Sequence, residues 1–469
     1  NLTRRPRFVP RHASSRAHGK QASAQRAQGV SVTASAAFLL QSIRREKGDI
    51  MELTPIYRSV AALDVHQAKL TVCVISETDD GDARCEIREF GGFKKDRHAM
   101  AEWVASFRPE VVVMESTGIY WKSPYAALER RGIRALVVNA RHVKQVPGRK
   151  TDIGDAQWLA ILARSGLLRG GFVPPANFRE LRLTSRQMQK LTGMLAAEKN
   201  RLHKVLTDAG IRLPVVVSDI HGQSARAMVK GLIAGECPEQ VLGYASKRLK
   251  ASQEELLDAL DGELSEKHRF VLGELMDHIE DLERRIARFS DHLLQGLAPQ
   301  QGLLQALQTI PGLDERGAAM LLVEIGDDMD AFGSGEKLAS WAGVCPGNHE
   351  SAGKRKSGKK RKGNPYVRRI LCEAANAAAR TRSALAELFK SLLIRRGRKR
   401  AIFALAHKLL KIVFVLISRG DYYRDATVDY EAMSVERNAP RWIRMLRKYG
   451  YIGAASGAAA PSRAQPALP

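Results

Sequence analysis

Four carboxylic acids have the spacing expected of a catalytic set. Asp64 and Glu115 each close a short apolar run that predicts a buried strand. Asp152 and Asp155 lie in a segment that predicts the start of a helix, where a spacing of three places both on one helical face. Because α/β proteins usually build their sites at the carboxyl edge of a sheet, we expect the four acids to converge.

Carboxylates that converge need compensating charge, because two of them about 4 Å apart repel by roughly 4 kcal/mol at an effective dielectric near 20. Mg²⁺ is a hard ion that carboxylates, waters and substrate phosphates bind together. Two such ions would suit an in-line displacement at phosphorus. Taken singly, each acid is better explained as a turn former or as a partner of a helix dipole. The order of all four is what favours a metal site.

A serine within a basic segment is the second candidate for chemistry. Ser351 begins a Ser-Ala-Gly stretch, and a serine beside cations could attack a phosphodiester while the cations hold the developing charge. A covalent phosphoserine would conserve the bond energy for strand exchange. From the residues alone, a solvated linker that grips phosphates is the stronger interpretation. The cations that follow the serine are Lys354, Arg355, Lys356, Lys359, Lys360, Arg361 and Lys362.

The elements that must position the acids alternate strands with helices. A tight link of four residues predicts a hairpin between the first two strands. Helical stretches near 97–107 and 121–131 separate the later strands, which indicates an α/β layered domain. The expected strands are residues 59–64, 70–76, 111–115 and 135–139.

The middle of the chain predicts long helices with a heptad seam. Apolar residues there alternate steps of three and four, which is typical of a coiled coil. A coiled-coil dimer and a packed helical hairpin within one subunit both explain the seam, and we prefer the dimer. The seam residues are Leu272, Leu275, Ile279, Leu282, Ile286, Phe289 and Leu293.

We expect five regions along the chain. Residues 1–50 are basic and poor in acids, and we interpret them as a disordered or non-native extension before a start at Met51. The α/β domain covers 51–175, the helical coiled-coil region 176–300, and a mainly helical, Gly-punctuated unit 301–450. Residues 451–469 predict a disordered tail, being rich in Ala, Pro and Ser.

Composition identifies the class of partner. The 469 residues include 75 Lys and Arg against 50 Asp and Glu, a net charge of +25, which implies a polyanion such as nucleic acid. Five cysteines without a C-x-x-C pair favour a reducing cytoplasm and argue against zinc. Residues 401–417 are the most apolar run, but three basic side chains interrupt it, so we expect a buried helix and no membrane partner.

The same segments resemble a known family. Leu63-Asp-Val-His66, Met114-Glu-Ser-Thr-Gly118 and Lys150-Thr-Asp-Ile-Gly-Asp155 are similar to the DEDD set of a RuvC-like (RNase H-like) domain. The specific resemblance is to transposases of the IS-one-ten family of bacterial insertion sequences, which act as bridge-RNA-guided recombinases. The resemblance implies that Asp64, Glu115, Asp152 and Asp155 bind Mg²⁺, as two ions.

The family resemblance extends to the serine segment. Members carry a Ser-Gly-Gly-Lys type segment between a Gly-Leu-x-Pro turn and a Gly-Asn…Leu-Arg-Arg helix, and this chain has Gly343-Val-Cys-Pro346, Ser351-Ala-Gly-Lys354, Gly363-Asn364 and Val367-Arg-Arg-Ile370. The resemblance implies that Ser351 takes the nucleophile's position and forms a phosphoserine. Ala352 in place of the first glycine is a departure that stiffens the loop, and Ser357 is the fallback candidate.

The resemblance also implies partners and places. It implies double-stranded DNA at the element ends and target, a structured guide RNA, a homo-oligomer (dimer or tetramer), and a place in the bacterial cytoplasm at the nucleoid. Thr309-Ile-Pro-Gly-Leu313 resembles the turn of a helix-hairpin-helix element, although an ordinary Pro-Gly turn explains it equally well. Further basic residues lack a base-reading pattern and suit backbone contacts: Arg368, Arg369, Arg395, Arg396, Arg398, Lys399 and Arg400.

Three other functions remain open at this point. A RuvC-like nuclease would hydrolyse DNA with metal and water and would not need Ser351. A nucleic-acid-binding scaffold would use its acids only for structure. An actin-like ATPase is disfavoured, because Val65-His-Gln-Ala occupies the place of the Gly-rich phosphate loop.

Overall fold

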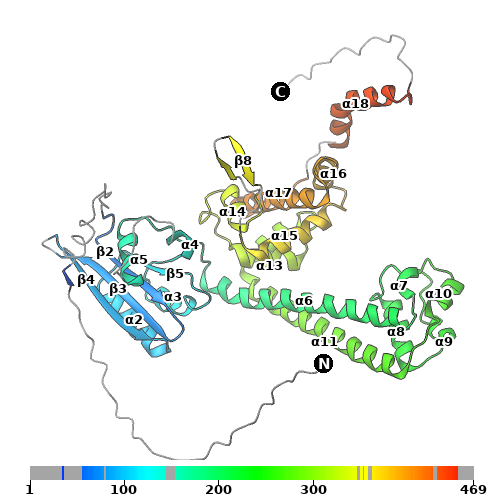
Figure 1. Cartoon of the computed structure of the whole chain (residues 1–469), viewed down its shortest axis with the longest axis horizontal. Helices are drawn as coiled ribbons and strands as arrows, with labels where there is room; N and C mark the ends of the chain where they lie inside the picture. Colours follow the sequence, from blue (N-terminus) through cyan, green and yellow to red (C-terminus); the bar gives the residue numbers. More distant parts are fainter. Residues whose placement is uncertain are drawn as a thin grey trace, which may run out of the picture. The chain divides into compact units, whose positions relative to one another are not determined.

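The computed structural model describes residues 34–35, 55–78, 81–143, 154–345, 349–351, 353–357, 362–425 and 430–452. The chain forms two compact units, and the boundary between them in the sequence falls between Gly171 and Phe172 (Figure 1). The expectations for residues 1–50 and 451–469 fall outside the described residues, apart from the short strand at 34–35 and residues 451–452.

The first unit alternates strands and helices, as the sequence predicts. The predicted hairpin, the third and fourth strands and both separating helices are present within a few residues of their expected bounds. Its elements are β1 (Ala34–Ser35), β2 (Ser59–Val65), β3 (Lys69–Glu77), β4 (Ala83–Gly91), α2 (Lys94–Ser106), β5 (Val111–Glu115), α3 (Lys122–Glu129), β6 (Ala135–Val138), α4 (Ala140–Val143) and α5 (Asp155–Arg164).

These strands form one mixed sheet in the order β1-β4-β3-β2-β5-β6. β2, β3 and β4 form an antiparallel meander, whereas β5 and β6 join parallel to β2 through helical crossovers. This sheet, followed by many helices, is compatible with a DEDD or RNase H-like domain. β4 is absent from the predicted set, because charged residues interrupt its sequence ARCEIREFG and only one of its residues is buried.

Both faces of the sheet are covered. Alternate residues such as Val60, Ala62 and Val113 pack beneath α5 in one core. The residues between them, such as Leu63 and Met114, are also fully buried. They belong to the opposite face, where Trp103 of α2 contacts Phe90 of β4 with ring centroids 5.6 Å apart. The alternation fixes which strand-end side chains share a face with α5.

The second unit is helical except for one hairpin. Its elements are α6 (Ala176–Asp208), α7 (Leu213–Val216), α8 (Gln223–Ala234), α9 (Pro238–Leu242), α10 (Gln253–Leu260), α11 (Glu266–Gly296), η1 (Ala298–Gln300), α12 (Gln301–Gln308), α13 (Glu315–Ile325), α14 (Gly335–Ala342), β7 (His349–Ser351), β8 (Lys354–Ser357), α15 (Pro365–Ala378), α16 (Ala384–Arg396), α17 (Arg398–Arg419) and α18 (Tyr430–Lys448).

The heptad seam belongs to a hairpin within the chain. α6 and α11 run antiparallel, since Lys199 near the middle of α6 pairs with Glu283 at 2.9 Å and Asp208 at its end meets His268 at 3.3 Å (Figure 1). Seam residues including Ile279 are buried between α11 and its neighbours. The preferred interpretation, a seam that joins two subunits, therefore loses its basis, because α6 supplies the partner helix.

The predicted buried helix is α17. It is long and apolar enough to cross a membrane, but half of its most apolar window is buried within the protein. Leu405, Leu409 and Val413 lie in the core of the second unit together with residues of α13 and α15. α17 therefore serves as a core helix, as expected from its interrupting basic residues.

The Pro-Gly turn lies between α12 and α13, so two helices flank it as a hairpin of helices requires. Gly312 has a φ of +86°, and a Cβ there would overlap the backbone of α15 at Ala374 and Ala378. Asp314 caps α13 by accepting a hydrogen bond from the Gly317 amide at 2.8 Å. Close packing against α15 is thus a sufficient reason for the glycine.

Candidate active site

Asp64 and Glu115 lie at the carboxyl ends of neighbouring parallel strands. Leu63 of β2 is in register with Met114 of β5, so the residues that follow them are neighbours at one edge of the sheet. Because side chains alternate along a strand, both acids project on the face that α5 covers. β-sheet register thus places two of the four predicted acids side by side.

Neither acid is paired with a lysine or arginine of the part of the chain that the structure describes. The Asp64 side chain is 28% exposed and its Oδ2 lies 3.3 Å from Nε2 of His66. Glu115 is half-buried. Among the residues that the structure describes, no lysine or arginine is within ion-pair distance of either carboxylate. The pair therefore presents oxygen ligands that the protein itself leaves available.

The third acid stands at the start of α5. The last residue of α5, Arg164, accepts hydrogen bonds from the amides of Ile56 and Tyr57, at 2.8 and 3.2 Å, just before β2 begins. α5 therefore runs opposite to β2, and its first residue is Asp155. Asp152 lies outside the described residues.

The donor chemistry fits a hard divalent cation. Two neighbouring, partly exposed carboxylates supply the oxygen ligands that Mg²⁺ prefers. Across the described ranges, no three His, Cys, Asp or Glu side chains lie close enough to hold a metal ion. The structure therefore sets Asp64 and Glu115 on neighbouring strands, but among the described residues it does not bring Asp155 together with them as a group of three ligands.

Ser351 occupies a more ordered position than the predicted loop. It is the last residue of β7 and pairs with Lys354, the first residue of β8. Only two residues separate them, and Gly353 has the positive φ (+73°) that a two-residue hairpin turn requires. The turn thus sets the serine backbone directly opposite the first lysine of the basic run. The fallback Ser357 ends β8, opposite His349.

The base of this hairpin is held by close backbone packing. Gly363 lies so near the end of α14 that a Cβ would overlap the backbone of Ala342 and Gly343. The next residue, Asn364, caps α15 by accepting hydrogen bonds from the amides of Tyr366 and Val367, at 2.9 and 3.3 Å. The chain therefore enters and leaves the serine hairpin at one tight junction, which we call the hairpin base (Ala342, Gly343, Gly363 and Asn364).

A buried glutamate fastens the hairpin base to α6. Glu324 of α13 is fully buried and accepts two hydrogen bonds from Arg186, at 2.7 and 2.9 Å, and one from Asn364 Nδ2, at 2.8 Å. Burial alone would raise the pKa of Glu324, but the Arg186 hydrogen bonds and the charges of Arg182 and Arg186 lower it. Burial lowers the pKa of Arg182 to about 10, against the opposing effect of Glu324. The glutamate is thus a fully satisfied structural ion.

The predicted basic residues fall into three groups. Lys362 and the run before it border the serine hairpin, but residues 359–361 lie outside the described residues. Arg369 is engaged by the protein itself, donating to Glu373 at 2.9 Å and to the Gln189 carbonyl at 3.3 Å. Arg368 is half-buried. The exposed group lies where α16 ends and α17 begins: Arg395, Arg396, Arg398, Lys399 and Arg400.

Cations in the first turn of α17 oppose its dipole. A helix N-terminus carries partial positive charge, so each added cation there is unfavourable by about 0.3–1 kcal/mol. Arg398, Lys399 and Arg400 nevertheless occupy that turn, directly after Gly397 with its φ of +72°. Bound phosphate would relieve the repulsion, which favours a polyanion at this end of α17.

Sequence patterns did not reveal the Glu324 cluster. The usable signal was a single acid within the apolar segment 318–325, an arrangement that requires a buried cationic partner. Its partner Arg186 lies 138 residues away, and no local pattern connects the two.

Comparison with known proteins agrees with this architecture. Residues 61–211 match the DEDD domain of IS110 transposases, described as a transposase, and residues 304–390 match the transposase IS116/IS110/IS902 family. The chain is 26% identical over 336 residues to a probable family 20 transposase of Pseudomonas aeruginosa, covering 70% of this chain and 90% of that protein. It is 25% identical over 333 residues to the transposase for insertion sequence element IS1111A of Coxiella burnetii, covering 68% and 81%.

A mixed sheet with strand-end acids, joined to a helical unit that carries the second matched segment, defines a DEDD-type transposase. The chain belongs to the IS110 family, the IS-one-ten family of the sequence analysis.

Proposed function

We propose that the chain cuts and rejoins DNA at the ends of an insertion sequence and at its target, guided by a structured RNA, with the strand-end acids and Ser351 acting on the same strand. The observation that carries this proposal is the register of β2 and β5, which sets Asp64 and Glu115 side by side without a cationic partner among the described residues. The two matched family segments support it, because one contains the acids and the other contains Ser351.

In this proposal Asp64, Glu115, Asp152 and Asp155 hold Mg²⁺, as two ions. Bound Mg²⁺ neutralises charge that develops on the phosphate. The carboxylates would hold the ions at the sheet edge, and they are accessible because Asp64 and Glu115 are only partly buried. α5 brings Asp155 toward that edge with its helix dipole favouring the negative side chain.

Ser351 supplies the nucleophile. Its hydroxyl oxygen forms a bond to phosphorus while the bond from phosphorus to the leaving sugar oxygen breaks, and the serine proton ends on the released hydroxyl. Reversal of this step with another strand's hydroxyl rejoins DNA without ATP. Lys354 opposite the serine, and the cations after it, would stabilise charge on the phosphate. The hairpin base fixes where the serine is presented.

The basic residues at the α16–α17 junction bind nucleic-acid backbone. They are exposed and form no base-reading pattern, which suits a protein in which RNA pairing selects the sequence. Their partners in this proposal are double-stranded DNA and the guide RNA. A place in the bacterial cytoplasm at the nucleoid follows from that role.

Replacing Ser351 with alanine tests the nucleophile. Wild-type protein with a suicide DNA substrate should yield a protein–DNA adduct that survives denaturation, and Ser351→Ala should yield none. Ser357→Ala is the matched control and should retain the adduct. If Ser351→Ala still cuts at the wild-type rate without an adduct, the chain is a metal-dependent nuclease that uses water.

We propose further that the protein acts as a homo-oligomer with sites shared between subunits. Mixing an Asp64→Asn chain with a Ser351→Ala chain should then restore strand transfer that neither variant shows alone. If the mixture stays inactive although the chains co-assemble, each subunit must contain a complete site.

A further inference from the structure

The last described helix, α18, has an apolar row along one side. Five apolar residues recur there in alternating steps of four and three, which is the spacing of a helix that packs against another helix. The last of them directly follows α18, and its amide donates to the Met445 carbonyl at 3.1 Å, so it continues the helical turn. We call these residues the α18 seam: Val435, Ala439, Trp442, Leu446 and Tyr449.

The α18 seam is uncovered within one chain. Its four larger side chains are between 42% and 63% exposed, and Ala439 is half-buried. α18 contacts α16 (Figure 1), but no described residue of α18 belongs to a hydrophobic core of the second unit. A contiguous exposed row of large apolar side chains marks a surface that binds a partner.

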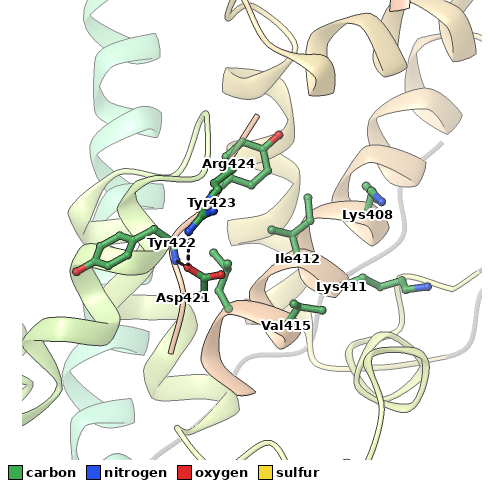
Figure 2. A pocket seen from close by; sticks show the side chains of 9 residues that line it. Lys408, Lys411, Ile412, Val415, Asp421, Tyr422, Tyr423 and Arg424 are labelled. Atoms are coloured by element: carbon green, nitrogen blue, oxygen red, sulfur yellow. Dashed lines mark hydrogen bonds and ion pairs between the residues drawn. The ribbon is translucent and has the colours of Figure 1, made fainter. Parts of the chain in front are cut away.

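The chain that leads to α18 is held in place. After α17, the segment 421–425 lies beside that helix (Figure 2). The Tyr423 amide donates to Thr309 Oγ1 at 2.8 Å, and the Asp425 carboxylate accepts a hydrogen bond from the Ala384 amide, at the start of α16, at 3.1 Å. α18 begins five residues further along the chain. The fixed segment therefore keeps the α18 seam close to α16.

The charged residues of α18 leave the seam itself uncharged. Pro440 also lies on the outer side of the helix, where its ring does not obstruct the seam. Glu436 and Arg447 are eleven residues apart, which is about three helical turns, so they lie on the same flank of the seam near its two ends. Three exposed cations lie on the side away from the seam: Arg441, Arg444 and Lys448.

We propose that α18 is a self-association surface, through which two copies of this chain pack seam against seam in antiparallel order. In that order Ala439 of each copy faces Trp442 of the other, so a small side chain meets a large one. A parallel pair would instead set the two Trp442 rings against each other. Antiparallel order also sets Glu436 of each copy beside Arg447 of the other, so the flanking charges are complementary.

A membrane surface is the other partner that a basic amphipathic helix can fit. Helices of that kind place lysine and arginine beside the apolar face, from which the long side chains reach the lipid headgroups. In α18 most of the exposed cations lie away from the seam, and Glu436 on its flank would be repelled by anionic lipid. The arrangement of charge therefore favours a second copy of the chain.

This surface rests on the homo-oligomer proposed above and names the element that assembles it. α18 lies beyond residue 390, where the second matched family segment ends, so the family match does not account for the seam. Pairing through α18 and the sharing of sites between subunits are separate properties. The first is measured as mass and the second as strand transfer.

The mass of the full chain in solution, measured by light scattering without DNA over a range of concentrations, tests the surface. Wild type should associate reversibly, with a mass that rises with concentration. Leu446→Glu should halve the assembled mass and weaken association at least about tenfold, because it would bury an unpaired charge between the helices. Arg444→Gln, on the outer side of α18, is the matched control and should associate as the wild type does. Both variants should keep the wild-type circular dichroism spectrum, because both positions are exposed.

Complementary variants test whether α18 meets α18 and in which order. Ala439→Trp sets large side chains against each other and Trp442→Ala leaves a gap, so each should associate weakly alone, whereas an equimolar mixture should associate again. Glu436→Arg should weaken association about threefold, because it faces Arg447 of the second copy, and Glu436→Arg combined with Arg447→Glu should restore it.

An assembled wild type with Leu446→Glu at the same mass would overturn the α18 surface and leave the homo-oligomer standing. A wild type that stays monomeric would overturn both, and if it binds anionic vesicles and Leu446→Glu does not, the seam serves a membrane. Unchanged association in Glu436→Arg would overturn the antiparallel order. None of these measurements involves cleavage, so a failure of the proposed DNA chemistry remains a separate result.

Discussion

Two acidic places in this chain have opposite environments. Asp64 and Glu115 lie at a sheet edge, partly exposed, with no lysine or arginine paired to them among the described residues. Glu324 lies in the core of the helical unit, fully buried, with Arg186 and Asn364 bound to its carboxylate.

We infer that the difference separates acids that serve function from acids that serve structure. A buried charge is tolerated only when the protein supplies its counter-charge and hydrogen bonds. An acid that must bind a cation from solution has to keep its lone pairs accessible. The comparison therefore predicts which substitution affects activity and which affects stability.

The largest effect is expected at the strand-end pair. Asp64→Asn and Glu115→Gln should each reduce strand cleavage by about 10²–10³-fold or more, because they remove charge that stabilises the reacting phosphate. Their free energy of unfolding should stay within about 0.5 kcal/mol of the wild type, since neither acid has a buried ion-pair partner. Cleavage assays paired with urea denaturation check this, and a large loss of stability would show that the pair is structural.

Glu324→Ala, unlike the strand-end variants, should strongly lower the free energy of unfolding. It leaves Arg186 and Arg182 without their anion in the core, and we expect a loss of about 3–5 kcal/mol in the free energy of unfolding. Glu274→Ala, on an exposed position of α11, is the matched control with a change below about 0.5 kcal/mol. Stability within that narrow range for Glu324→Ala would contradict the contrast between the two places.

The hairpin base connects the Glu324 cluster to the serine hairpin. Gly363→Ala should push the backbone of Ala342 and Gly343 aside and cost about 1–3 kcal/mol of stability. We expect a larger relative loss in formation of the serine adduct than in DNA binding, because the hairpin is displaced. Gly302→Ala, at a helical position with open space, should be neutral or stabilising by up to about 1 kcal/mol. Unchanged adduct yield in Gly363→Ala would show that the base does not position the serine.

A smaller, pH-dependent effect is expected at the α6–α11 hairpin. Hydrogen bonds from Arg226 lower the pKa of Glu283 from 4.5 to about 2. A lowered carboxyl pKa adds stability above the unfolded value of 4.5, and that stability is lost as pH falls toward 2. Wild type should therefore be more stable than Glu283→Gln at pH 7 and equal to it near pH 2, by urea unfolding. A difference that persists at low pH would mean that packing, not charge, stabilises this contact.

Local patterns in the sequence are sufficient for most of the α/β unit. Alternating apolar residues and acids at strand ends predicted β2, β3, β5 and β6, because burial of a strand leaves a periodic trace. β4 was missed because only Cys85 is buried along it. Periodicity also could not tell which helix covers a seam, so Ile279 fits a partner from the same chain as well as one from another.

Contacts between distant residues left no such trace. The pairing of Arg186 with Glu324, and the overlap that makes Gly363 necessary, depend on tertiary packing between segments far apart in the chain. The sequence predicts Ser351 in a loop. In the structure it ends a strand of a hairpin, because Gly353 adopts the positive φ of the turn. The motif identified the serine, but only the structure gives the elements that hold it.

Binding of Mn²⁺, a paramagnetic substitute for Mg²⁺, tests the role of the strand-end acids most directly. Electron paramagnetic resonance should show Mn²⁺ bound by the wild-type chain, and Asp64→Asn and Glu115→Gln should each lose that binding. Glu89→Gln, an exposed acid of β4 already paired with Lys69, should bind as the wild type does. Wild-type affinity in both strand-end variants would contradict the account.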